Sequence, residues 1–235
     1  MSEHKVSFEI AAGKSMEIST GKMANLAAGS VLVRQGDTVI IVAACTGPAR
    51  EGADFFPLQI DYREKYCSAG KFPGGYIKRE GRPTEKEILT CRVTDRPIRS
   101  MFPKGFFNEV QIQALTLSTD SVNDPDMLCM IGASAALSLS SLPFMGPIGA
   151  LRVGMINGEF VANPTIQEMK ESSLELIYAG TPGKVIMIEG ECDELTEEQL
   201  EAAMRFADTV VAKQVEAQNQ LVAEAGKEKV APTLK

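Results

Sequence analysis

The segment Met127–Leu142 constrains the fold more than any other part of this chain. Its side chains are those of Met, Leu, Ile, Cys, Ala, Gly and Ser, and none is charged. A helix that is apolar or small on every side is buried between layers. The segment is too short and too rich in serine for a membrane span, which needs roughly 20 apolar residues. The sequence therefore predicts a central helix, begun by Asp124-Pro125-Asp126 with Pro125 at the first helical position.

Strand patterns lie on both sides of this predicted helix. The stretches before it that predict strands are Lys5–Ile10, Ser30–Gln35, Thr38–Cys45, Phe56–Tyr66 and Glu109–Ser118. The stretches after it are shorter, at Ala150–Met155, Gly158–Val161, Leu174–Tyr178 and Val185–Ile188. Thr196 and Gln199 then form a capping box at the start of a long helix. We expect an α+β fold of mixed β-sheets packed on helices, in two similar β-α lobes at 1–143 and 144–226, with a tail at 227–235.

Composition excludes several kinds of site. The chain has one histidine, His4, so Ser–His–Asp triads and His-ligated zinc are excluded. Its five cysteines contain no CxxC pair, which is typical of free thiols in a cytoplasmic protein. The N-terminal residues contain no apolar stretch suited to export, and no membrane partner is expected.

The basic stretch 71–104 stands out from this acidic background. It holds nine Lys or Arg residues against four Asp or Glu, whereas the whole chain has a formal charge of −7. A protein this acidic binds a polyanion through a local patch rather than through its overall field. The stretch divides into a glycine-rich loop and a helix over 84–102, which Thr84 and Glu87 cap.

Three arginines share one arc of this predicted helix, because Arg92, Arg96 and Arg99 are spaced i, i+4 and i+7. Helical spacing places the solvent face opposite them and Ile88 and Leu89 beside them near the core. The residues expected on that solvent face are Lys86, Glu87, Thr90 and Thr94. The arginines either pair internally with Asp95 and Glu85 or bind an oxyanion, and local evidence leaves both open. Pro97 is expected to kink or end the helix.

The loop before the helix combines glycines, one aromatic residue and three cations in Gly74–Arg82. Such a combination fits single-stranded nucleic acid, whose bases stack on rings while its phosphates meet Lys and Arg. A solvated basic loop with no ligand is the alternative.

Four segments carry a family resemblance: Gly81-Arg82-Pro83, Asp95–Arg99, Ile131–Leu139 and Gly146–Gly149. On these segments the chain resembles the first of the two ribonuclease-PH-like core domains in the polynucleotide phosphorylase (polyribonucleotide nucleotidyltransferase) family. The resemblance covers nearly the whole chain. It implies a cytoplasmic phosphorolytic 3′-to-5′ exoribonuclease that degrades mRNA to nucleoside diphosphates, with inorganic phosphate as co-substrate.

The resemblance also implies binding partners and an active site that needs a second core domain. Family members are homotrimeric rings around a channel for single-stranded RNA, with RNA-degradosome proteins as further partners. A helical domain and a second core follow the first core, so the tail at 227–235 is expected to lead toward that helical domain. The second core binds Mg²⁺, and we expect this chain alone to be inactive.

Residue roles follow from the same resemblance. Arg92 and Arg96 match catalytic positions that face the reacting phosphates, in support of the second core. The RNA-binding positions match Tyr76, Lys78, Arg79, Arg82 and Arg99. Ile77 replaces a second aromatic residue of the family's channel loop, which leaves stacking to Tyr76.

The family's metal-binding positions match Met169, Glu175 and Ile177 in this chain. One carboxylate beside a thioether and an aliphatic side chain does not make a Mg²⁺ site, so no metal is expected here. The alternative is a catalytically inert, ring-forming RNA-binding subunit of an exosome-like assembly.

Overall fold

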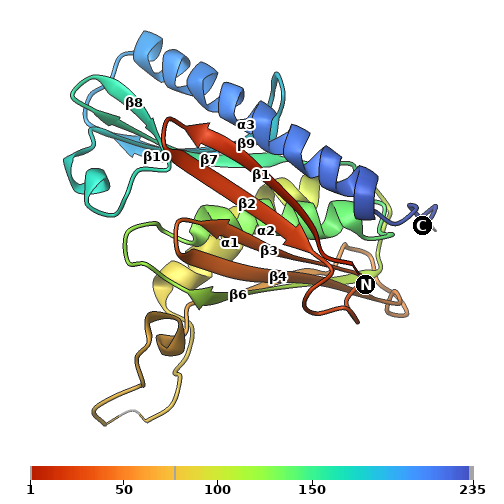
Figure 1. The fold of residues 1–235 in the computed structure, drawn as a ribbon. Helices are drawn as coiled ribbons and strands as arrows, with labels where there is room; N and C mark the ends of the chain where they lie inside the picture. The colour runs from red at the N-terminus through yellow and green to blue at the C-terminus, as the bar shows by residue number, and fades with distance from the viewer. Residues whose placement is uncertain (1, 77, 233–235) are drawn as a thin grey trace.

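The computed structural model describes residues 2–76 and 78–232, and it has an α+β architecture (Figure 1). The strands of the first sheet are β1 (His4–Ala11), β2 (Lys14–Thr20), β3 (Gly29–Gln35), β4 (Thr38–Gly47), β5 (Leu58–Arg63) and β6 (Glu109–Ser118). Its order is β1-β2-β3-β4-β6-β5, and β5 runs parallel to β6 while the other pairs are antiparallel.

The second sheet is smaller and antiparallel, with the order β10-β9-β7-β8. Its strands are β7 (Gly149–Ile156), β8 (Glu159–Ala162), β9 (Leu174–Thr181) and β10 (Lys184–Cys192). The helices are α1 (Glu85–Ser100), α2 (Asp126–Leu139) and α3 (Glu197–Ala225), with short 3₁₀ turns η1 (Tyr66–Ala69) and η2 (Glu168–Glu171). Among the described residues, no helix is both long and apolar enough to cross a bilayer.

Helix α2 is the centre of the core, as its sequence predicts. All of its residues are buried, and it contacts β3, β4, β7 and the other two helices. Figure 1 shows it behind the first sheet, with α3 running along β1. Two details of the prediction are wrong. Pro125 is the N-cap, so the helix begins at Asp126, and it ends at Leu139 rather than at Leu142.

Gly132 allows α2 to approach the first sheet closely. A Cβ atom at this position would overlap Cγ2 of Val42 on β4 and lie 3.2 Å from Cγ2 of Val33 on β3. Both valines are fully or almost fully buried, and their short branched side chains cannot swing away. Only glycine fits between helix and sheet here.

Replacing this glycine should therefore destabilise the protein. We expect Gly132→Ala to lower the free energy of unfolding by about 1–3 kcal/mol, because overpacking forces the helix off the sheet. Urea denaturation followed by circular dichroism measures the change. Gly74→Ala is the matched control, because a Cβ there meets no atom within 4 Å. Equal stability of the Gly132 variant and this control would contradict the argument.

Helix α1 begins as its sequence predicts but is turned differently about its axis. The Thr84 hydroxyl accepts from the Glu87 amide at 3.2 Å, and the Glu87 carboxylate accepts from the Thr84 amide at 2.6 Å. Glu87, Thr90 and Thr94, which were predicted to face solvent, are buried. Ile88 and Leu89, predicted near the core, are exposed. Pro97 does not end the helix, which continues to Ser100.

The reason for the rotation is that polar groups on α1 find partners inside. The Glu87 carboxylate also accepts from the Glu64 amide at 2.8 Å, so its burial leaves no unpaired oxygen. The Thr94 hydroxyl lies 3.8 Å from Sγ of Cys129 on α2. Residue polarity alone therefore misplaced the buried face of this helix.

Two glutamines join α3 to the start of the second sheet. The Gln214 side chain accepts from the Ala150 amide at 2.7 Å and donates to the Ala150 carbonyl at 2.8 Å. The Gln218 amide donates to the Ile148 carbonyl at 2.8 Å, and its oxygen accepts from the Ser134 hydroxyl at 2.8 Å. The same hydroxyl accepts from the Ile148 amide. These buried side chains, which no sequence pattern indicated, connect α2, α3 and β7.

Candidate functional site

The segment between β5 and α1 projects from the body of the protein (Figure 1). Its near end is anchored, because the Thr119 amide donates to the Ser68 carbonyl at 3.0 Å. The Glu80 carboxylate accepts from the Tyr66 amide at 3.1 Å and so joins the outgoing and returning arms. Between this segment and strands β5 and β6 lies a groove of about 830 Å³.

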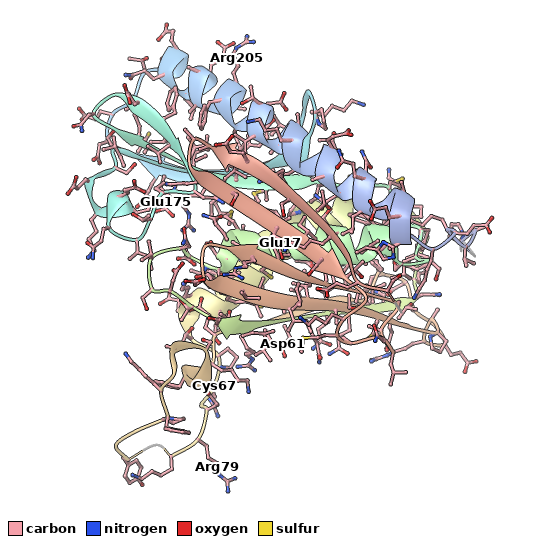
Figure 2. All side chains as sticks on the ribbon, in the orientation of Figure 1. Glu17, Asp61, Cys67, Arg79, Glu175 and Arg205 are labelled. Carbon is pink, nitrogen blue, oxygen red and sulfur yellow. The ribbon has the colours of Figure 1, made fainter. Side chains whose placement is uncertain are left out.

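The predicted RNA-contacting residues of this segment are accessible. The Tyr76 side chain is 100% exposed, and Lys78, Arg79 and Arg82 are exposed as well. Tyr76, Arg79 and Arg82 line the groove. Figure 2 shows Arg79 on the projecting segment, well away from the sheets. Ile77, the position where the second aromatic residue is lost, lies outside the described residues.

Arg92 and Arg96 are exposed on α1. Arg96 forms an ion pair with Glu189 on β10, so its guanidinium is directed toward the second sheet. Within the described chain, Arg92 has no carboxylate partner within ion-pair distance. The sequence could not foresee the pair with Glu189, because the two residues are 93 positions apart.

Arg99 is held more firmly than the other two arginines. Its guanidinium donates to both carboxylate oxygens of Asp95 at 2.7 Å, one helical turn away. It also donates to the carbonyl oxygens of Phe56 at 2.7 Å and Leu58 at 3.2 Å, and it lies 5.6 Å from the centre of the Phe56 ring. Internal pairing thus describes Arg99, whereas contact of this residue with RNA stays a prediction.

The three positions matched to a metal site do not fit Mg²⁺. Met169 and Ile177 offer no oxygen ligand, and the Glu175 carboxylate lies 3.2 Å from Nε of Arg152. Within residues 2–76 and 78–232, no three His, Cys, Asp or Glu side chains gather closely enough to hold a metal ion. The donor chemistry at this place therefore suits an ion pair rather than a cation site.

Arg152 on β7 is the centre of a partly buried ionic network beside the start of α2. It pairs with Asp126 at the start of α2, with Asp124 at 3.7 Å and with Glu175 on β9. Lys86 of α1 binds Asp124 at 3.0 Å from the other side. Burial raises the pKa of Asp126 to about 6, although the charge of Arg152 acts to lower it. The network is a structural connection between α1, α2 and the second sheet.

Tyr66 and Glu189 are candidate site residues that sequence reasoning missed. Tyr66 lines the groove from η1, and its side chain is 52% exposed. Its signal in the sequence is an aromatic residue next to a glycine-rich loop, but the strand pattern of Phe56–Tyr66 places it at the end of a strand. Glu189 gave no signal, because charged residues are common on exposed strands.

Comparisons with known proteins agree with this architecture. Residues 12–143 match the model of the 3′ exoribonuclease family, domain 1, and residues 146–210 match domain 2 of the same family. The chain is 55% identical over 208 residues to a polyribonucleotide nucleotidyltransferase of Akkermansia muciniphila, covering 88% of this chain and 29% of that protein. It is 48% identical over 236 residues to one of Geobacter sulfurreducens, covering 99% and 34%. The chain thus spans about a third or less of the length of these relatives.

Two solved structures share the fold. One is the Archaeoglobus fulgidus exosome with RNA bound to the active site, with a TM-score of 0.64, 19% identity and coverage of 83% of this chain and 85% of that chain. The other is rice Rrp46, with a TM-score of 0.69, 14% identity and coverage of 88% and 94%. At these identities the likeness concerns the fold alone, and that fold is ribonuclease-PH-like.

Proposed function

Because this chain belongs to the 3′ exoribonuclease family, we propose that it is the first core domain of a phosphorolytic exoribonuclease. In this proposal the enzyme degrades mRNA from the 3′ end. Inorganic phosphate attacks the terminal phosphodiester and a nucleoside diphosphate leaves. The chain provides RNA-binding and phosphate-facing side chains, while the second core domain holds Mg²⁺.

The observation that carries the proposal is the contrast between two places in the chain. Cations stand exposed on the projecting segment and on α1, at Lys78, Arg79, Arg82, Arg92 and Arg96. The metal-matching positions instead hold Met169, Ile177 and an already paired Glu175. A domain with exposed guanidinium groups, and with no set of metal ligands among its described residues, suits a supporting role in phosphoryl transfer.

Each group has a physical task in this role. A guanidinium presents parallel N–H donors that match two oxygens of one phosphate, so Arg92 and Arg96 can orient the attacking and scissile phosphates. Tyr76 offers a ring for base stacking, and Lys78, Arg79 and Arg82 offer charge to the RNA backbone. We further propose that the enzyme is a cytoplasmic homotrimer around an RNA channel, with RNA-degradosome partners.

The chain alone should bind RNA without degrading it. We expect the chain to release no nucleoside diphosphate when it is incubated with poly(A), Mg²⁺ and phosphate. Fluorescence anisotropy should nevertheless detect binding to RNA that weakens as salt is added. The double variant Lys78→Ala/Arg79→Ala should reduce the slope of log K against log salt by about 1.4, because each phosphate contact to a single strand contributes about 0.7. Robust diphosphate release by the chain would contradict the proposed division of labour.

The same assay carries a matched control. Arg205 is exposed on α3, far from the projecting segment, and pairs with Glu201 one turn away (Figure 2). Arg205→Ala should leave the salt slope unchanged. If the slope falls equally in this control, RNA binds across the whole surface of the protein, and the proposed interface is wrong.

A further inference from the structure

The groove under the projecting segment has the features of a site for one nucleotide. Its volume of about 830 Å³ lies within the range of small-molecule sites, roughly 300–1,000 Å³. Two tyrosine rings line it, Tyr66 from η1 and Tyr76 from the outer part of the segment. Its floor is provided by β5 and β6 through Asp61, Gln113, Ala114 and Leu115. Rings and cations thus surround a single recess.

Four cations and four carboxylates line this groove, and the cations are the more available to a ligand. The lining carboxylates are Asp61, Glu64, Glu80 and Glu87, and each has a partner within the protein. Those partners are Arg63, Lys86 and the amide groups of Tyr66, Thr84 and Glu64. Within the part of the chain that the structure describes, the lining cations Lys65, Arg79 and Arg82 form no ion pair. An anionic ligand therefore meets three free cations here.

Tyr66 has a backbone that hydrogen bonds hold in place. Its backbone amide donates to the Glu80 carboxylate, and its carbonyl accepts from the Lys71 amide at 3.0 Å. Gly70, in the left-handed conformation, closes the turn behind it. Only the side-chain torsions of Tyr66 therefore remain to be restricted when a base stacks on its ring.

We propose that this groove binds one nucleotide of single-stranded RNA, with its base stacked on Tyr66 and its phosphate held by Arg79 and Arg82. The inference rests on the proposed function and adds a binding residue to it. Tyr66 then supplies the second aromatic surface that the channel loop lacks at position 77. The lining cations Lys65, Arg79 and Arg82, which form no ion pair among the described residues, favour RNA because its phosphates follow one another along the strand.

The experiment uses oligo(A) with 2-aminopurine at successive positions, whose fluorescence falls when the base stacks. We expect Tyr66→Ala to weaken binding of the chain to RNA roughly 5-fold or more and to abolish quenching at one position. Tyr66→Phe keeps the ring and should behave as the wild type. Phe72→Ala is the matched control, because this ring is 91% exposed on the same segment but does not line the groove.

The outcomes separate the inference from the function beneath it. If Arg79→Ala weakens binding while Tyr66→Ala does not, the nucleotide site is wrong and the RNA-binding segment stands. If neither variant changes binding, the proposed function fails as well. If Phe72→Ala loses as much as Tyr66→Ala, the outer surface of the segment binds RNA and the groove does not. A change of oligomeric state in Tyr66→Ala without an RNA effect would assign the groove to a second copy of the chain.

Discussion

Replacing Arg96 by alanine in the enzyme that contains both core domains should reduce turnover by about 100-fold or more, with little change in RNA affinity. The loss of one preorganised donor to a developing phosphate charge has an effect of this size. Many other cations contribute to RNA binding, so the affinity for RNA should change little. Steady-state phosphorolysis gives the turnover, and anisotropy with labelled oligo(A) gives the affinity.

Two further variants make this result specific. Arg96→Lys retains the charge but cannot bind two phosphate oxygens in parallel, so it should recover only part of the turnover. Arg205→Ala should keep full activity, because Arg205 pairs with Glu201 on α3, far from the projecting segment (Figure 2). Equal losses of turnover and affinity in Arg96→Ala would favour the alternative, a ring-forming RNA-binding subunit with no catalytic duty.

Replacing Arg152 by methionine should lower the free energy of unfolding by about 3–5 kcal/mol. The substitution removes the partner of Asp126, whose carboxylate is almost completely buried, and leaves an uncompensated charge inside the protein. Urea unfolding measures the change. Arg34→Met is the matched control, because Arg34 forms an exposed pair with Asp37 and such pairs contribute about 1 kcal/mol or less.

The pH dependence of the stability lost in Arg152→Met tests whether the charge of Asp126 causes the loss. The pKa of Asp126 is raised above its usual value of 3.8 to about 6, so its stabilising contribution is present below pH 3.8 and disappears as pH rises through about 6. Without Arg152 the charged form of Asp126 is still less favourable, because Asp124 repels it and Lys86 compensates only in part. The loss in Arg152→Met should therefore be larger at pH 8 than at pH 5. If the loss of stability does not depend on pH, it comes from lost packing and not from the charge of Asp126.

Local signals in the sequence predicted much of the secondary structure. The strand predicted at Glu109–Ser118 has the bounds of β6, and both capping boxes, Thr84 with Glu87 and Thr196 with Gln199, are present. These features depend on neighbouring residues, which is why they can be read from the sequence. Strand β2 was missed because Lys14–Thr20 alternates too weakly, with buried Ser19 beside Ile18.

The candidate site was harder to predict, because its geometry depends on residues far apart in the chain. The loop and the arginines of α1 stand out by composition, but the pair between Arg96 and Glu189 and the burial of Thr94 depend on tertiary packing. The groove exists because the segment after β5 lies over the neighbouring strand β6, which comes much later in the chain. The lobe boundary at 143 and the roles of the individual cations stay predictions.

The buried glutamines Gln214 and Gln218 have a consequence for how the domain moves. Their amides bind the backbone of Ile148 and Ala150, a few residues after the predicted lobe boundary at 143. The Gln218 oxygen also accepts from Ser134 on α2, which lies before that boundary. A hinge needs backbone torsions that are free to change, and here the torsions are fixed by hydrogen bonds that water cannot replace. The two predicted lobes should therefore turn as one rigid body when RNA enters. In the proposed trimeric enzyme, any opening of the ring would then have to occur between subunits or between core domains.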